Sequence, residues 1–464
     1  MSPMLKSIDL KNQGAVLIIS LIFIAVFSAL AVSMVTMSGN NVQLAENQQK
    51  SDCARACAES GFDVIRYWLN RVSISGTIEP SERCSQFAYA LQNELYSQGI
   101  TNITVSYNSS EITIQNVTLD SETNSSFSTI ITPLDNDTLQ VEITGYYGSM
   151  SYKIRGNYYF SERGNTVFDF GVASKGPLSL TGNVDLESVN LAVEASVYIE
   201  SENSNLALSI TGNSQIAGDV KIVNSIATVD LQGGKAGIGG ETGQDAIDNH
   251  VDFGVPPSEF PEPVPGQFES YATNIVDANT DTSSNATFEN IKILANTNPT
   301  FSGNATLKGV IYIETPNVVE FTGGADVTGI IVGDGDITDN SGVNQLKFTG
   351  NVDSHPISEL PEEAQFDELR DKTGTFIMAP GFSTSFGGNF SALCGAIAAN
   401  GIEFHGNAGG IINGSVINYS DELMTLSGNT DLYFNRSGIT EAPAGFVPET
   451  ILQFHPESYS EVML

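Results

Sequence analysis

The stretch that decides the fold is GAVLIISLIFIAVFSALAVSMV, residues 14–35. It carries no charge, and only Ser20, Ser28 and Ser33 interrupt its apolar side chains. About 20 apolar residues, each rising about 1.5 Å, span the hydrocarbon core of a bilayer. The stretch therefore predicts a membrane-spanning helix, and the two lysines ahead of it predict a cytoplasmic leader. The residues that open this helix are Ala15, Val16, Leu17, Ile18, Ile19, Leu21, Ile22 and Phe23.

Three interpretations of this helix are open. Ala29-Leu30-Ala31 offers a small-x-small site for a signal peptidase, and a plain membrane anchor is the second alternative. In the third, the chain is cut between Gly14 and Ala15, ahead of the helix, so that the helix stays on the mature protein. The third is favoured because the pattern continues past Ala31 as an amphipathic helix to about Arg71.

The residues KNQGAVLIISLIFIAVFSALAVSMVTMSGNNVQLAENQQKSDCARACAESGFDVIRYWL (11–69) resemble the N-terminal region of PilX-type minor pilins. Residues 289–332 and the tail 443–461 are similar to the C-terminal half of PilX-like pilins that carry a β-rich domain. The resemblance implies a leader that prepilin peptidase removes, N-methylation of the new N-terminus, and assembly with major and minor pilins of a type IV pilus. It also implies a precursor in the inner membrane and a mature chain in the periplasm or on the cell surface.

One departure from the family pattern concerns the position of a subunit in the fibre. Most major pilins have a Glu five residues after the cleavage Gly, where this chain has Ile19. A carboxylate in an apolar bundle needs a partner, so a subunit with nothing above it does not need that Glu. PilX-type pilins and the K-type pseudopilin of type II secretion share the departure, which favours a place at or near a tip. A membrane-tethered protein that never polymerises fits Ile19 equally well.

Length and charge restrict the class of protein. A chain of 464 residues is expected to fold into two or more units. Its 54 acidic and 19 basic residues give a formal net charge of −35, which argues against binding to nucleic acid. The 44 glycines, among many Asn, Ser and Thr, are typical of short strands joined by tight turns.

The expected fold class is an α+β pilin-like part, a long helix on an antiparallel sheet, followed by a mainly β domain. Short apolar-Gly-Asn motifs recur every 20 to 30 residues, for example in LSLTGNVDL (178–186), LSITGNSQI (208–216) and LSGNTDL (426–432). This spacing favours a parallel β-helix (β-solenoid), with Gly at the corners and Asn in ladders, over a sandwich or jelly roll. The predicted segments are leader 1–14, stalk helix 15–72, head 73–165, solenoid 166–250, Pro-rich insertion 251–290, solenoid 291–440 and tail 441–464.

Within these segments the sequence predicts several finer features. Residues 87–98 read as a short helix in the head, Gly148-Ser149 as a hairpin turn, and residues 362–371 as a helix outside the solenoid. Cys53 and Cys57 lie one helical turn apart, a poor geometry for a bond with each other. Cys84, just past the helix, can pair with either of them, and Cys57–Cys84 is the candidate disulfide.

No catalytic residues are expected, and the chain is predicted not to be an enzyme. The four histidines are scattered, and no G-x-S-x-G, HExxH or P-loop motif occurs. The only candidate cofactor is calcium, because two loops present several oxygen ligands. The candidate calcium ligands are Asp277, Asn279, Asp281, Ser283, Asp334, Asp336 and Asp339.

The sequence thus predicts a minor pilin of a tip or initiation complex that presents an acidic solenoid to an extracellular surface or glycan. Two alternatives stay open: a tip subunit of a secretion pseudopilus, and a membrane-anchored carbohydrate-binding or carbohydrate-active β-helix.

Overall fold

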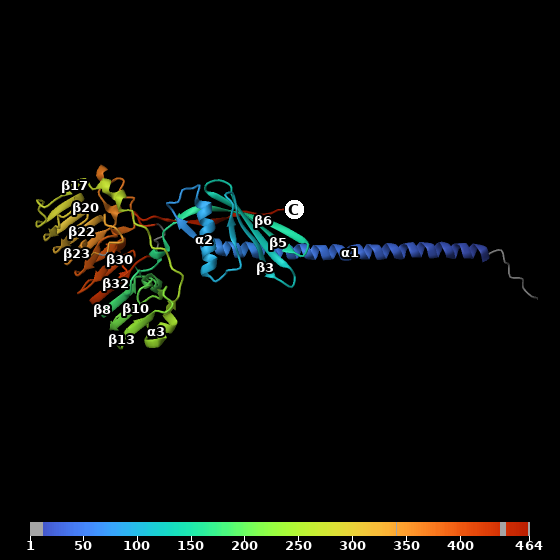
Figure 1. Cartoon of the computed structure of the whole chain (residues 1–464), viewed down its shortest axis with the longest axis horizontal. Helices are drawn as coiled ribbons and strands as arrows, with labels where there is room; N and C mark the ends of the chain where they lie inside the picture. The colour runs from blue at the N-terminus through green and yellow to red at the C-terminus, as the bar shows by residue number, and fades with distance from the viewer. Residues whose placement is uncertain (1–12, 340, 437–441, 463–464) are drawn as a thin grey trace, which may run out of the picture. The chain divides into compact units, whose positions relative to one another are not determined.

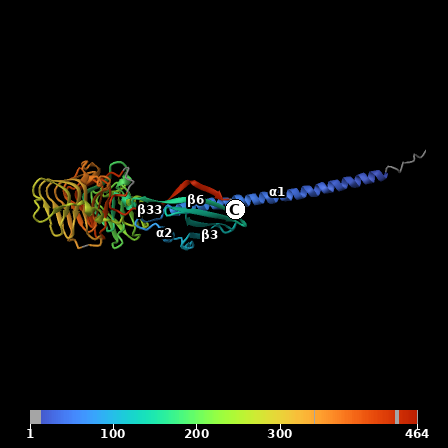
Figure 2. The same cartoon turned by 90° about the horizontal axis from the view of Figure 1, so that it is seen from above.

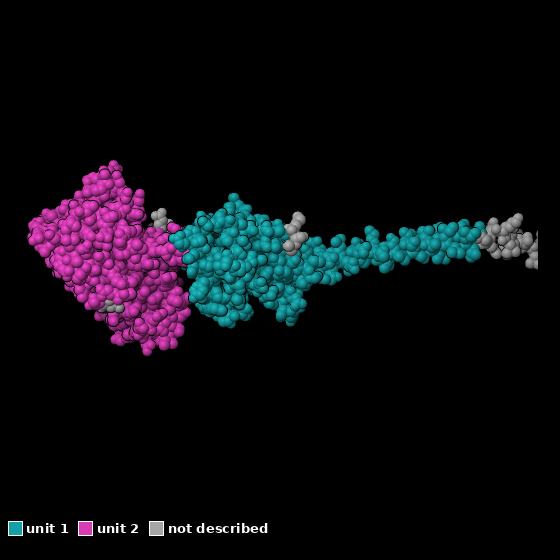
Figure 3. Space-filling model, turned by 45° about the horizontal axis from the view of Figure 1, so that its top comes forward, with its two compact units in different colours: residues 1–74, 79–161, 452–464 teal, residues 75–78, 162–451 magenta. Residues whose placement is uncertain are grey.

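The computed structural model of the chain describes residues 13–339, 341–436 and 442–462 (Figure 1). The chain divides into two compact units, which Figure 3 distinguishes by colour. Unit 1 comprises the described residues up to 74, residues 79–161 and the C-terminal residues from 452. Unit 2 comprises residues 75–78 and 162–451. The predicted order, a long N-terminal helix followed by a large mainly β region with parallel sheets, is confirmed.

Unit 1 contains the helices α1 (Gln13–Leu69) and α2 (Arg83–Ser97), and α2 coincides closely with the predicted short helix. Its sheet, called the head sheet here, has the strand order β1-β33-β6-β5-β4-β3-β2. The pairs from β2 to β6 are all antiparallel. The strands are β1 (Ser73–Ser75), β2 (Val105–Tyr107), β3 (Ile112–Asp120), β4 (Ser125–Pro133), β5 (Thr138–Tyr147), β6 (Met150–Arg163) and β33 (Glu449–Val462).

The second half of α1 packs against β4 and β5. Ala58 and Ile65 are buried there, and glycines on both elements permit the close approach. A Cβ on Gly145 of β5 would lie 2.2 Å from the backbone nitrogen of Ala58, closer than any side chain fits. A Cβ on Gly61 of α1 would lie 2.7 Å from the ring of Phe127 on β4. Helix and sheet therefore meet backbone to backbone.

In unit 1 one predicted connection is found in the structure and another segment differs from its prediction. The hairpin at Gly148 is confirmed: Tyr147 pairs with Met150, and Gly148 has a φ of 58°, as a two-residue turn requires. The tail differs from the prediction, because β33 lies within the head sheet between β1 and β6 instead of forming a separate segment. Unit 2 is therefore inserted, in sequence, between two neighbouring strands of the head sheet.

Unit 2 is built from two mostly parallel sheets. The first, called the phenylalanine sheet, has the main order β15-β14-β11-β8-β32-β29-β26-β23-β21-β19; in it only the β14–β15 pair among the described ones is antiparallel. Its strands are β8 (Leu178–Ser188), β10 (Leu206–Gly212), β11 (Gln215–Ile216), β13 (Thr228–Gln232), β14 (Gly237–Ile238), β15 (Glu241–Thr242), β19 (Thr300–Phe301), β21 (Val318–Phe321), β23 (Gln345–Phe348), β26 (Ser383–Phe386), β27 (Ala392–Cys394), β29 (Ile402–Phe404), β30 (Gly410–Asn413) and β32 (Met424–Phe434).

The second, called the covered sheet, has the main order β16-β12-β9-β7-β31-β28-β25-β22-β20-β18-β17. Along the chain its strands alternate with those of the phenylalanine sheet, and the successive turns are visible from above in Figure 2. The strands are β7 (Val172–Ser174), β9 (Val197–Ile199), β12 (Val220–Ile222), β16 (Val251–Phe253), β17 (Asn274–Val276), β18 (Ala286–Ile293), β20 (Ala305–Ile313), β22 (Ala325–Gly333), β24 (Val352–His355), β25 (Thr375–Ala379), β28 (Ala396–Ala399) and β31 (Val416–Asn418).

The repeats seen in the sequence pair with one another in register. Gly182 of β8 is the partner of Gly212 on one side and of Gly428 on the other, so three copies of the motif lie side by side. The side-chain amide of Asn183 donates to Oδ1 of Asn429 at 2.9 Å, a rung of the expected asparagine ladder.

The order of the strands is not the order of the chain. From β7 and β8 the chain adds strands in one direction, and this arm finishes with helix α3 (Gly243–His250) and strand β16. It then resumes at the opposite end of both sheets with β17 to β19 and returns until β32 pairs with β8 along 11 residues. The sheets thus consist of two arms that meet at a seam formed by β8 and β32.

The core between the two sheets contains a column of stacked phenylalanines. The ring centroids of Phe301, Phe321, Phe348, Phe386 and Phe404 follow at 4.7, 5.1, 5.0 and 4.8 Å, with neighbouring ring planes within 13° of parallel. Each ring is almost completely buried. One phenylalanine per strand at the same register position therefore fills the core of the longer arm.

The outer face of the covered sheet is also apolar, and two segments lie over it. The first, called the strap, is residues 254–272, which contributes Phe260 and Phe268. The second is the insert 356–372, in which the predicted helix is wrong: only 3-10 turns form, at Ile357–Glu359 and Ala364–Phe366. The insert buries the apolar side chains Ile357, Leu360, Phe366 and Leu369, and this packing explains why a regular helix is not adopted.

Candidate functional site

The first half of α1 is an apolar surface that nothing in the described chain covers. The large apolar side chains from Val16 to Val35 are between 49% and 72% exposed. Burying one such side chain is worth about 1.5–3 kcal/mol, so this surface favours a lipid or protein environment. The helix is long and apolar enough to cross a membrane. The exposed apolar half of α1 is therefore the candidate functional site.

Two hydroxyl groups, one within this half and one just after it, are bonded to the backbone of the helix itself. The Ser20 hydroxyl donates to the carbonyl of Leu17 at 2.9 Å, and the Thr36 hydroxyl donates to that of Val32 at 2.9 Å. Such back-bonding removes the cost of placing a hydroxyl in an apolar medium.

The charged residues begin beyond the apolar stretch. The first carboxylate after Ala15 is Glu46, which forms an ion pair with Lys50 at 2.6 Å, and this contact lowers the pKa of Glu46. Ile19 is 53% exposed and presents an apolar side chain where a pilin fibre subunit would have a Glu. Among the described residues, the first 30 residues of this helix therefore take part in no ion pair.

The predicted processing site is described only in part. Gly14 and Ala15 lie in the first turn of α1, which begins at Gln13. The remainder of the predicted leader, residues 1–12 with both of its lysines, lies outside the described residues. The cleavage between Gly14 and Ala15 stays a prediction.

One family model matches the N-terminal part of the chain. Residues 13–63 match the family model described as PilX N-terminal. The N-terminal region is therefore similar to that of PilX-type pilins. The matched segment contains the whole exposed apolar half of α1 and the start of the half that packs on the head sheet. The resemblance read from the sequence is confirmed over these residues.

Comparisons with curated proteins and with solved structures give no further support for a family. A search of curated proteins found no match. Among solved structures the chain is similar to the competence-associated pilin ComZ from Thermus thermophilus, with a TM-score of 0.28 and 11% identity over 89% of this chain and 98% of ComZ. A TM-score this low carries no argument about fold or function.

The predicted disulfide does not form in the structure. Cys53, Cys57, Cys84 and Cys394 are all free thiols. Cys57 is buried and is hydrogen-bonded to Ser125 on β4, whereas Cys84 is buried at the start of α2. Burial raises the pKa of both thiols. Spacing along the chain suggested the pair, but the structure shows no bond between the two thiols.

The first predicted calcium loop is held together by its own hydrogen bonds. Asp277 accepts from the backbone N–H of Asn279 at 3.0 Å, and Asp281 accepts from that of Ser283 at 2.9 Å. These bonds, with those from nearby side chains, lower the pKa of both carboxyl groups. They are the bonds of tight turns, and they orient the carboxylates toward the chain that carries them.

The second predicted calcium loop is arranged in the same way. Asp336 accepts from the N–H of Thr338, and Asp339 from that of Ser341, which lowers the pKa of both. Among the described residues, no group of three or more His, Cys, Asp or Glu side chains is placed to hold a metal ion. The structure therefore does not gather the predicted ligands into one site.

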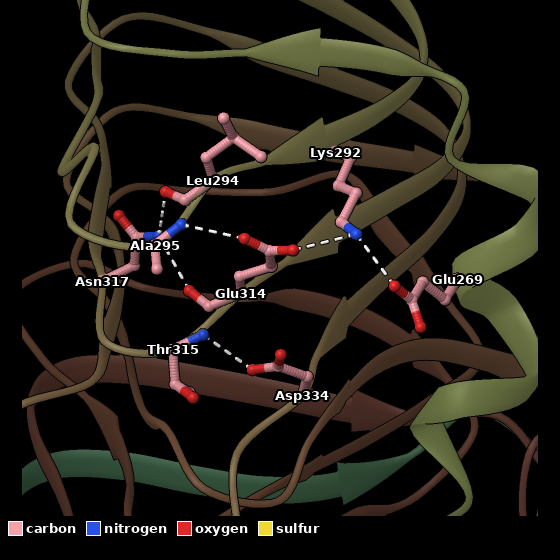
Figure 4. A network of polar contacts seen from close by, with 8 residues as sticks. All are labelled: Glu269, Lys292, Leu294, Ala295, Glu314, Thr315, Asn317 and Asp334. Carbon is pink, nitrogen blue, oxygen red and sulfur yellow. Dashed lines mark hydrogen bonds and ion pairs between the residues drawn. The ribbon is translucent and has the colours of Figure 1, made fainter.

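Asp334 belongs to a different network, shown in Figure 4. It accepts from the N–H of Thr315 at 2.7 Å, while burial raises its pKa. In the same network Lys292 bridges Glu314, which directly follows β20, and Glu269 of the strap, at 2.8 Å each. Lys292 thus attaches the strap to the covered sheet, and Asp334 holds the backbone just after β20 through Thr315.

The sequence analysis overlooked one pair of carboxylates. Asp185 of β8 and Asp431 of β32 are direct neighbours in the parallel ladder at the seam. Burial, and then the charge of Asp431, raises the pKa of Asp185. The signal was present, because both aspartates occupy the same position of the repeated motif, but the sequence did not show that these two copies are adjacent.

Proposed function

We propose that this chain is a non-enzymatic minor pilin of a type IV pilus system. The observation that carries the proposal is the apolar half of α1, exposed along its length and contained in the segment that matches the PilX N-terminal family. In this role the helix is first held in the inner membrane and then packs among the helices of major and minor pilins. Both environments cover apolar surface, which water does not.

Processing and position follow from the same helix. Prepilin peptidase cuts after Gly14, and Ala15 becomes the N-methylated first residue. Ile19 supports a place at or near the tip, because the subunit offers no carboxylate to the amine of a neighbour. The partners are other pilins and the peptidase, and the mature chain lies outside the cytoplasm.

Unit 2 is the part that the pilus presents. We read its two parallel sheets, with alternating strands and in-register repeats, as the successive coils of a β-solenoid. One outer face is covered by the strap and the insert, so the outer face of the phenylalanine sheet is the surface offered to an extracellular surface or glycan. Adhesion is the role that a large repetitive surface supports best.

The experiment removes unit 2 without damaging the head. A truncation after residue 165 would also remove β33 from the head sheet, so an internal excision is needed. Arg163 and Glu449 are joined by an ion pair at 2.9 Å, so a hairpin loop of about four residues can replace the segment between them. The excised chain is expected to enter pili while surface attachment falls to background. Unchanged attachment would contradict the display role.

A tip subunit of a secretion pseudopilus is the second candidate, because Ile19 fits it equally well. The two are distinguished by deleting the whole chain. Loss of pili or of attachment with normal secretion supports the pilus, whereas loss of secretion with normal pili supports the pseudopilus.

A further inference from the structure

The last strand of the chain completes the first folded unit. In the head sheet β33 lies between β1 and β6. Between the end of β6 at Arg163 and the start of β33 at Glu449 lies nearly the whole of unit 2. The head sheet is therefore not continuous until the final residues of the chain have arrived.

The apolar contacts of β33 show that it forms part of the head core. The ring centroid of Phe454 lies 5.3 Å from that of Phe62 on α1 and 5.2 Å from that of Tyr158 on β6. Gly156 leaves room for this ring, since a Cβ there would lie 2.8 Å from it. Leu452 is 2% exposed. Without β33, the rings of Phe62 and Tyr158 would lose the cover of Phe454.

Polar contacts fix the same strand to two elements. The Ser458 hydroxyl oxygen accepts from the backbone N–H of Asn157 on β6 at 2.7 Å. Glu461 forms an ion pair with Arg55 of α1 at 2.6 Å and accepts from the hydroxyl of Tyr152 at 2.5 Å. These contacts extend along the strand from its centre to its end, so β33 binds the head through its full length.

We infer that β33 is a locking strand. Without it the head sheet stays open, and β33 closes the sheet only after unit 2 has been exported and folded. A chain that emerges N-terminus first presents α1 and β2 to β6 long before residue 449 appears. During that interval β6 is an open edge with exposed aromatic side chains, a state that native proteins avoid. The arrival of residues 449–462 closes the edge, so a closed head reports that unit 2 has already been exported.

The first test uses the chain truncated after Pro448, in detergent, with hydrogen exchange as the readout. Amides of Arg155, Asn157 and Tyr159, whose N–H groups lie on the side of β6 away from β5, are expected to exchange at least tenfold faster than in the full chain. A synthetic peptide of residues 449–462, added in trans, is expected to restore their protection. The peptide with Phe454→Ser fails to do so, whereas the control peptide with Gln453→Ser, altered at an exposed position, succeeds. Full protection of β6 in the truncated chain without peptide would overturn the inference.

The second test keeps the full chain and follows its refolding by pulsed hydrogen exchange. Amides of β6 are expected to gain protection only after those of β8 and β32, which form the seam of unit 2. Phe454→Ala is expected to delay protection of β6 alone, and Gln453→Ala to leave the order and the rates unchanged. Protection of β6 before the seam forms would overturn the proposed order even if β33 stabilises the final head.

Discussion

Two columns of apolar side chains in this molecule are made of similar residues but differ in burial. The phenylalanine column of unit 2 is buried almost completely between two sheets. The apolar half of α1 remains about half to three-quarters exposed on every large side chain from Val16 to Val35. The difference lies in what the chain supplies around them: two sheets enclose the first column, and no described segment covers the second.

This difference separates stability from assembly. A buried apolar column lowers the free energy of the folded unit, so its alteration should unfold that unit. No part of the folded units covers the apolar half of α1. Altering it should therefore change membrane retention or assembly with a partner, and not the stability of the units. The predictions below test this division, beginning with the largest expected effect.

Ile22→Lys places a charge in the centre of the exposed apolar half of α1. A charged residue at the middle of a spanning helix costs about 2.5–3.5 kcal/mol or more, so retention in the membrane fraction and recovery in pili should be lost. The thermal midpoints of both folded units should not change. Gln48→Lys, further along the same helix at an exposed position, is the control and should leave retention intact. Normal pilus recovery of Ile22→Lys would break the division.

Phe348→Ala tests the enclosed column. Removing a buried ring from the middle of the stack should lower the unfolding free energy of unit 2 by about 3–5 kcal/mol, because a cavity is left. Denaturant unfolding followed by circular dichroism measures this loss, and membrane retention should be unchanged. Phe288→Ala, at the end of the stack and only partly buried, should cost less. Equal losses for the two variants would contradict a continuous column.

Gly145→Ala tests the boundary between the two behaviours, where α1 stops being exposed and packs on the head sheet. The added methyl group would lie 2.2 Å from the backbone of Ala58, so helix and sheet must separate. We expect a loss of about 1–3 kcal/mol in unit 1. Gly39→Ala is the control. Gly39 lies on α1, no atom lies within 4 Å of the new methyl group, and the change should not destabilise the chain. A silent Gly145→Ala would mean that the helix does not pack there.

Glu200 supplies the smallest effect, a dependence of unit 2 on pH. Burial raises its pKa to about 7, so the folded state favours the protonated form. This contribution is complete below the unfolded pKa of about 4.3 and is lost as the pH rises through 7. Because Glu200 is partly exposed, we expect a loss of only about 1 kcal/mol between pH 5 and pH 8. Glu200→Gln should remove this difference in urea unfolding, whereas Glu403→Gln, at an exposed position that does not contribute to the raised pKa of Glu200, should retain it.

Local patterns in the sequence were sufficient to predict local structure. The uncharged stretch from Ala15 indicated the helix, and the repeated Gly-Asn motifs indicated strands that pair in register, as Gly182 and Gly428 do. The order of the strands could not be predicted, because copies of one motif do not specify which copy is the neighbour. The Pro-rich segment read as an insertion is in fact the link between the two ends of the sheets.

Two further differences have a common physical cause. The sequence predicted a separate tail at 441–464, yet contacts of Phe454 with Phe62 and Tyr158 hold residues 449–462 as a strand of the head sheet. In the insert, Phe366 and Leu369 pack onto the covered sheet and override local helix propensity. In both cases partners distant in sequence decide the structure, and no local pattern reveals them.

The most direct test of the central claim is the mature N-terminus, determined by mass spectrometry of membrane and sheared-fibre fractions. The account predicts a chain that begins at Ala15, N-methylated, in both fractions, because the exposed apolar half of α1 must stay on the protein in order to assemble. A chain that begins at Val32 would have lost that half of the helix, and an uncleaved Met1 would leave a plain anchor. Either result would contradict the assembly role of the helix.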